Sequence, residues 1–160
     1  ITGALLLIVL FAEYHTVDPE DDRFGLSRLV LNLATYVTAF SLYAAIYSTK
    51  VRSLQSATSI FFISLLLALE LFRGTEATVK RTWLYALVVG LVVGETTWGL
   101  NYWAISGLGG GVFLLLVFYI VSGIIQNYFS GKLNKAIVFE FGAVTAVAFA
   151  FLLSSRFWVG

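Results

Sequence analysis

Long apolar segments recur along almost the whole chain and are separated by short polar connections. An α-helix needs about 20 predominantly apolar residues to cross about 30 Å of hydrocarbon. A membrane β-strand would instead alternate in polarity over about 10 residues, and runs such as Phe113–Val121 do not alternate. The pattern predicts an all-α integral membrane protein, a bundle of about six transmembrane helices with short loops. The expected helices are 1–14, 26–48, 54–72, 82–104, 108–129 and 135–158.

The composition favours the same class. Of the 160 residues, 59% are hydrophobic and 12% are charged, whereas soluble domains average about 45–50% apolar and about 25% charged residues. The short connections leave no room for a soluble domain, so we expect residues 1–160 to form a single polytopic membrane domain. Because the sequence starts at Ile1 inside an apolar run, we expect the first helix to be incomplete at its N-terminus.

Several kinds of chemistry lack the residues they need. The chain has no Cys and a single His, His15, so no metal centre or haem is expected. A net charge of +1, without a basic stripe, argues against a nucleic-acid partner. No Walker, Gly-x-Ser-x-Gly or His-Glu-x-x-His motif occurs, and these are the motifs that would position phosphates, a nucleophile or zinc. We therefore assign no catalytic residue and do not favour an enzyme.

The basic residues are divided unequally between the two ends of the predicted helices. Cytoplasmic loops of membrane proteins carry an excess of Lys and Arg. The connections 13–25, 73–81 and 130–135 would lie on one side and are predicted to be cytoplasmic. That side holds Arg23, Arg28, Arg73, Lys80, Arg81, Lys132 and Lys135, and the other holds Lys50, Arg52 and Arg156.

A carboxylate, Glu95, lies near the middle of the apolar run Trp83–Ala104. A charged side chain at the centre of a bilayer costs about 2.5 to 3.5 kcal/mol even on the lower scales. We therefore expect Glu95 to be protonated, paired, or facing a polar interior. It could bind a ligand or a proton, or its neutral carboxyl could bond to Tyr43 or Ser59 and hold two helices together. The candidate ligand- or proton-binding residues are Glu95, Trp98, Asn101, Tyr43, Tyr47 and Ser59.

The helix that carries Glu95 has two distinct faces. Glu95, Trp98 and Tyr102 follow i, i+3, i+7 spacing and share one face. Small and polar residues at i, i+4, i+7, i+11 form an adjacent stripe, where we expect either a cavity or a close helix contact. That stripe consists of Gly90, Gly94, Thr97 and Asn101.

Glycine is concentrated in the run Gly107–Gly111. We interpret it as a tight turn that lets the fourth and fifth helices cross closely. A re-entrant backbone that coordinates an ion or a phosphate is the alternative.

A second polar network is predicted towards the more basic side. Arg28 and Glu140 could neutralise each other, with Gln126 nearby, while Glu70 has a simpler partner in Arg73 at i+3. We expect a structural network, with binding of a headgroup or an ion as the alternative. Its members are Arg28, Asn32, Glu70, Gln126 and Glu140.

These observations lead to one functional hypothesis and one alternative. The first is a non-catalytic multi-pass membrane subunit or packing module of a larger membrane assembly, in contact with lipid or an apolar cofactor. The alternative is a small proton-coupled transporter or channel in which Glu95 titrates. Lipid, carotenoid and quinone all suit the 14 Phe, 8 Tyr and 4 Trp, and the aromatic content does not discriminate among them. Expected partners are membrane lipids and other membrane subunits or further copies of the chain.

Overall fold

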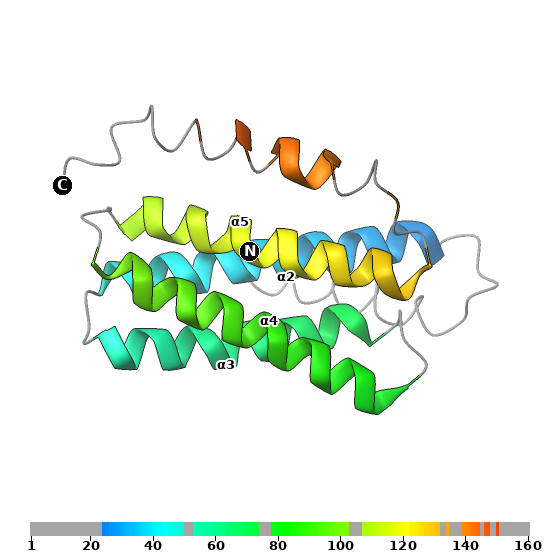
Figure 1. Ribbon diagram of the computed structural model, residues 1–160, viewed down its shortest axis with the longest axis horizontal. Coiled ribbons are helices and arrows are strands. Elements are labelled where there is room, and N and C mark those ends of the chain that lie inside the picture. Colours follow the sequence, from blue (N-terminus) through cyan, green and yellow to red (C-terminus); the bar gives the residue numbers. More distant parts are fainter. Residues whose placement is uncertain are drawn as a thin grey trace. The chain divides into compact units, whose positions relative to one another are not determined.

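Every regular element in the described part of the chain is an α-helix (Figure 1). The computed structural model describes residues 24–49, 53–73, 78–102, 107–131, 134, 139–144, 146–147 and 150. Four helices in these ranges are long and apolar enough to cross a membrane. They are α2 (Phe24–Ser48), α3 (Ser53–Phe72), α4 (Val79–Leu100) and α5 (Gly107–Phe129).

The apolar runs predicted both ends of α2, α3 and α5 to within two residues. The predicted range of α4 was displaced. We expected α4 at 82–104, but it begins at Val79 and ends at Leu100. Its first turn takes in Lys80 and Arg81, which a helix end tolerates because long basic side chains reach the interface. At the other end, the Tyr102 amide bonds to the Gly99 carbonyl oxygen and closes a turn. The predicted helix 1–14 lies outside the described residues, as does most of 135–158.

The chain divides into two compact units, Ile1–Thr38 and Ala39–Gly160, with the boundary inside α2. Of the first unit the structure describes 24–38, which is helical throughout. The second unit contains the rest of α2 together with α3, α4 and α5, and the contacts described below belong to it.

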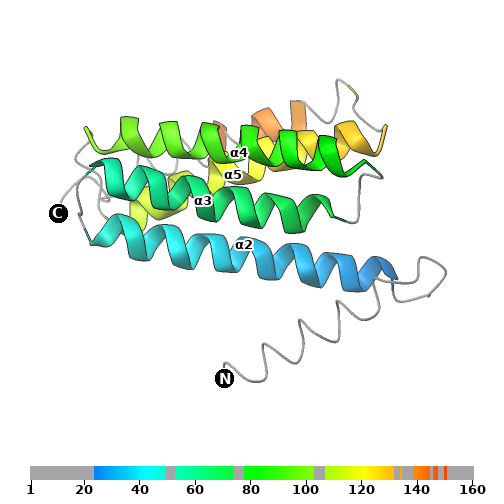
Figure 2. The ribbon, with the colours of Figure 1, turned by 90° about the horizontal axis from the view of Figure 1, so that it is seen from below.

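Helices α3 and α4 lie side by side in close contact (Figure 2). A Cβ atom added at Gly90 would lie 3.0 Å from the Phe61 carbonyl oxygen, and one at Gly94 would lie 3.1 Å from the Phe61 Cβ. Small residues let membrane helices approach until their backbones touch. The expected close contact along the small and polar stripe of α4 is therefore confirmed, and its partner is α3.

The glycines at the start of α5 make a second close contact, with α2. A Cβ atom at Gly111 would lie 2.8 Å from the Ala44 Cα, and one at Gly110 would overlap the Tyr47 ring. The run Gly107–Gly111 is the first turn of α5, so both interpretations of it as a turn or a re-entrant backbone were wrong. Glycine is required there because α5 packs directly on the α2 backbone.

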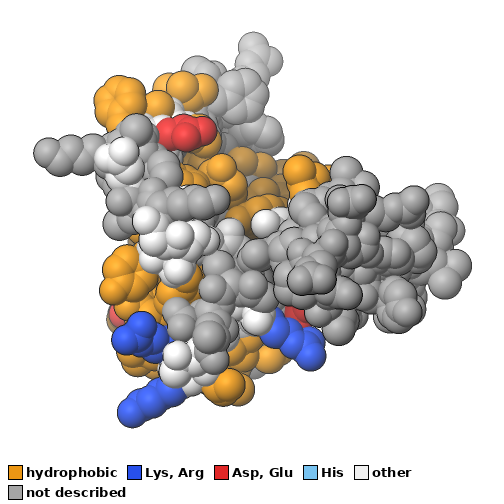
Figure 3. Space-filling view, turned by 90° about the vertical axis from the view of Figure 1, so that its right-hand side faces the viewer, with side chains coloured by type: hydrophobic (Ala, Val, Ile, Leu, Met, Phe, Trp, Pro, Cys, Tyr) orange, Lys and Arg blue, Asp and Glu red, His pale blue; other side chains and the backbone are white. Residues whose placement is uncertain are grey.

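Aromatic rings join α3, α4 and α5 near the end where α3 stops and α4 starts. The Phe129 ring meets the Phe72 ring edge-on at 5.5 Å and the Tyr85 ring at 5.0 Å between centroids. Such pairs stabilise a packed interior beyond the area they bury. Arg73, Lys80 and Arg81 lie at the same end and are exposed. Figure 3 shows this end, where Lys and Arg side chains lie beside hydrophobic surface.

Candidate functional site

Tyr43 lies in the packed interior and has a single polar partner among the described residues. Its ring is fully buried and meets the Phe118 ring edge-on at 6.2 Å. Its hydroxyl lies 2.6 Å from the Ser64 Oγ on α3. Because the one Ser64 hydroxyl proton is donated to the Ile60 carbonyl oxygen at 2.7 Å, Tyr43 must be the donor to Ser64.

Tyr47 lies one turn further along α2 and bonds to the end of α4. Its hydroxyl donates to the Leu100 carbonyl oxygen at 2.8 Å. The last four carbonyl groups of a helix have no partner within that helix. Tyr47 therefore caps the final carbonyl of α4 from a neighbouring helix.

Asn101 ties the same end of α4 to the beginning of α3. Its Nδ2 donates to the Ser53 Oγ at 3.1 Å and to the Ser56 Oγ at 3.2 Å. Ser56 in turn donates to the Ser53 backbone carbonyl oxygen, so Asn101 holds the first turn of α3 through two serine hydroxyls.

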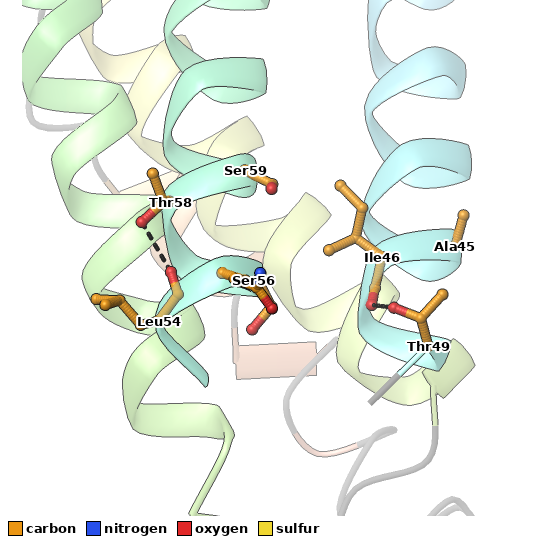
Figure 4. Close-up of a pocket in the computed structure, with 8 residues that line it drawn as sticks. Ala45, Ile46, Thr49, Leu54, Ser56, Thr58 and Ser59 are labelled. Atoms are coloured by element: carbon orange, nitrogen blue, oxygen red, sulfur yellow. Dashed lines mark hydrogen bonds between the residues drawn. The ribbon is translucent and has the colours of Figure 1, made fainter. Parts of the chain in front are cut away.

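Ser59 faces an open groove between α2 and α3, away from the α4 contact (Figure 4). The groove has a volume of about 630 Å³. The hydroxyls of Thr49 and Thr58 along it already bond to backbone carbonyl oxygens of their own helices. Among the described residues, no acidic or basic side chain that could activate a hydroxyl lines the groove. Its walls are Ala45, Ile46, Thr49, Leu54, Gln55, Ser56, Thr58 and Ser59.

Glu95 lies on the outer face of α4. Its side chain is exposed, and Trp98 beside it is 57% exposed. The two residues point away from the face that carries Gly94 and Thr97, which is buried. Because α4 ends at Leu100, Glu95 is five residues from the helix end, about 7.5 Å along the axis. We expected Glu95 near the middle of its apolar run, but it lies closer to the C-terminal end of the helix.

The six candidate residues thus occupy four separate places. Tyr43 and Tyr47 lie in the interior, Asn101 at the α3–α4 contact, Ser59 in the groove, and Glu95 with Trp98 on the outer face. Among the described residues Glu95 has no hydrogen bond or ion pair. The expected bond from Glu95 to Tyr43 or Ser59 is therefore not formed, because the helix rotation that packs Gly94 on α3 turns Glu95 outward.

The second network is also divided. Glu70 pairs with Arg73 at 3.7 Å, as predicted from their spacing. Gln126 donates to the Leu71 carbonyl oxygen at 3.4 Å, in the last turn of α3. Glu140 is exposed and makes no such contact with a described residue, and Asn32 belongs to the other unit. The Arg28 side chain, and with it the pair to Glu140, lies outside the described residues.

The buried serine and threonine hydroxyls, unlike those of Tyr43 and Tyr47, are satisfied by the backbone close to them in sequence. Each bonds to a backbone carbonyl oxygen three or four residues earlier, as Thr97 does to Val93 at 2.8 Å. Within the described ranges no buried side-chain polar atom lacks a partner, and no three potential metal ligands come together. The hydroxyl-bearing residues that follow this pattern are Thr35, Ser56, Ser64, Thr82, Thr97 and Ser122.

Comparison with known proteins gives a family. Residues 1–155 match the family described as "Protein of unknown function (DUF5656)". The chain belongs to the DUF5656 family. No curated protein and no solved structure matches the chain.

Two important partners in this DUF5656 chain were not among the candidates. Ser64 lies in an apolar run of α3 and accepts from Tyr43, while the Leu100 carbonyl belongs to the backbone and carries no sequence signal. An isolated Ser in a predicted membrane span is a signal for an interhelical hydrogen bond. That signal could have drawn attention to Ser64, but nothing in the sequence could have selected Tyr43 as its donor.

Proposed function

We propose that the protein is a non-catalytic multi-pass membrane subunit that packs within a larger membrane assembly through the outer face of α4. The proposal includes six membrane-spanning helices, with the connections 13–25, 73–81 and 130–135 on the cytoplasmic side. It also includes lipid or another apolar molecule, such as a carotenoid or a quinone, as a neighbour of the exposed apolar surface.

The outward position of Glu95 is the observation that carries this proposal. Large apolar residues surround it on the exposed face of α4, among them Leu91 and Trp98. A carboxyl group facing hydrocarbon has no hydrogen-bond partner there and is costly in either protonation state. A neighbouring helix that supplies a partner removes this cost, so Glu95 favours association of α4 with a further helix.

The packed interior supports a structural role over transport. Tyr43, which would help to line a path for solute, is enclosed by Ser64 and Phe118. The groove beside Ser59 does not include Glu95 among its walls. A proton-coupled transporter would need these groups along one water-accessible path. We therefore rank the transporter as the second candidate.

Native purification tests the proposal. The full chain would be expressed at its natural level, extracted in a mild detergent and eluted by size, and mass spectrometry would identify co-purifying chains and small molecules. We expect other membrane chains in fixed stoichiometry with the wild-type protein. We expect them to be reduced with Glu95→Leu, which removes the polar group from the outer face.

The matched control is Gln55→Leu, which also replaces an exposed polar residue of a span with leucine. It should leave the co-purifying chains unchanged. A wild-type protein that elutes without any other chain would contradict the proposal. Proton-coupled uptake that is lost in Glu95→Gln, with folding retained, would favour the transporter instead.

A further inference from the structure

The exposed residues on the outer face of α4 follow a heptad pattern. We call Leu84, Val88, Leu91, Glu95 and Trp98 the α4 seam. Their spacing alternates between four and three residues, and all five side chains are exposed. This is the spacing of the a and d positions through which two parallel helices interlock as knobs into holes. In the described part of the chain no helix covers the seam.

The seam lies opposite the side of α4 that the bundle already uses. The side chains of Ala86, Val89 and Val93 are fully buried, and Gly90 and Gly94 touch α3. At 100° per residue, these positions lie about 100° to 180° around the helix from Glu95. A partner can therefore occupy the seam without disturbing the contacts of α4 with its own bundle.

We propose that this partner is α4 of a second copy of the chain. Two copies inserted with the same topology have parallel α4 helices, related by a two-fold axis along the membrane normal. Each seam residue then meets its own counterpart at the same depth. Parallel in-register pairing is what a heptad seam supports. This inference rests on the proposed function and names one partner within the assembly.

The single carboxyl of the seam fits such a pair. A neutral carboxyl group carries both a hydrogen-bond donor and acceptors, so two Glu95 side chains facing each other across the axis can satisfy one another. Polar side chains of this kind hold membrane helices together. The seam contains no Lys or Arg. Two carboxyl groups that bond to each other need no basic residue as a partner. A polar group in one layer also fixes the register of the two helices.

Disulfide cross-linking in native membranes tests the pairing. Residues 1–160 contain no Cys, so an introduced cysteine has no competing thiol among them. Three variants of the full chain would each carry one cysteine, in place of Val88, Leu91 or Trp98. After mild oxidation, gel electrophoresis without reductant would detect the linked pairs. We expect linked pairs of this chain at the seam positions. The controls are Phe62→Cys and Leu66→Cys, which lie at exposed positions of α3 and should remain single. Equal cross-linking at the control positions would overturn the proposal.

Variants at position 95 test the role assigned to the carboxyl. Glu95→Gln keeps a donor and an acceptor, so the yield of linked Leu91→Cys pairs should stay within about twofold of the Glu95 background. Glu95→Leu should reduce it about fivefold or more. A Glu95→Leu protein that pairs as well as Glu95→Gln would overturn the role of the carboxyl. Helix content by circular dichroism separates loss of pairing from loss of folding.

The identity of the cross-linked products distinguishes failure of this inference from failure of the proposed function. Seam-linked pairs in a preparation without other chains would uphold the pair and refute the larger assembly. Co-purifying chains that become linked to the seam in place of a second copy would uphold the assembly and refute the pair. A preparation with neither product would refute both.

Discussion

Tyr43 donates a hydrogen bond from α2 to the Ser64 hydroxyl on α3, across 2.6 Å in the packed interior. The bond is asymmetric, since Ser64 also donates its own proton to Ile60. Removing Tyr43 Oη leaves Ser64 with a partner, whereas removing Ser64 Oγ leaves a buried donor with none. The two residues of one hydrogen bond should therefore differ in their contribution to stability.

We predict that Tyr43→Phe lowers the free energy of unfolding by about 0.5–1.5 kcal/mol, the net value of one hydrogen bond. Ser64→Ala should lower it by about 1–3 kcal/mol, because a buried hydroxyl is left unsatisfied. The measurement is unfolding by dodecyl sulfate in mixed micelles, followed by circular dichroism. In the double variant the effects should add to less than the sum of the two single changes. Equal effects of the single changes, with full additivity, would contradict this bond.

Glycine at position 111 should be essential for the packing of α5 on α2. A Cβ atom there would lie 2.8 Å from the Ala44 Cα, in the backbone, so Gly111→Ala must push the two helices apart. We predict a loss of about 1–3 kcal/mol in the free energy of unfolding. Gly99→Ala is the control, because a Cβ atom at Gly99 meets nothing within 4 Å, and it should be neutral or slightly stabilising. The same unfolding assay decides between them.

Tyr47→Phe should loosen the end of α4. The change removes the donor to the Leu100 carbonyl oxygen while keeping the ring, and we expect a loss of about 1 kcal/mol in the free energy of unfolding. Amide hydrogen exchange near Asn101 should become faster, because this end of the helix would fray more readily. Tyr102→Phe provides the control, since Tyr102 is 82% exposed. An equal effect of both changes would argue against the cap.

The predicted orientation in the membrane can be tested with two further single cysteines. Thr49 follows α2 and Thr78 precedes α4, and both are exposed. Because the Thr78 side is the more basic one, it should be cytoplasmic. A membrane-impermeant maleimide should label Thr49→Cys in intact cells and Thr78→Cys only after permeabilisation. The reverse pattern would show that the opposite side is cytoplasmic.

The sequence was sufficient to locate the described helices, because the thickness of a bilayer sets the length of each apolar run. It also predicted either a cavity or a close helix contact along the stripe that contains Gly90 and Gly94, and the structure has the close contact. The end of α4 was misplaced because residues that follow Leu100 are still largely apolar. Hydropathy alone does not show at which residue the helical hydrogen bonds of α4 end.

The candidate site was harder to predict. Spacing shows that Glu95 and Trp98 share a face, but it does not say whether that face points towards the bundle. We grouped Glu95 with Tyr43 because both were expected at a similar depth, towards the less basic side of the membrane. The glycines that bring α4 against α3 set its rotation and turned Glu95 outward. Pairing between helices depends on such rotations, which a single sequence does not contain.

The buried hydroxyls that bond to their own helices have a consequence for how this protein is made. Because Ser64, Thr97 and Ser122 are satisfied by carbonyl oxygens of the same helix, their hydroxyls need no second helix as a partner while a span enters the bilayer. Insertion and association can then be separate stages, with finished helices meeting afterwards. Side chains such as Tyr43, Tyr47, Asn101 and Gln126 would make their interhelical bonds only in that later stage.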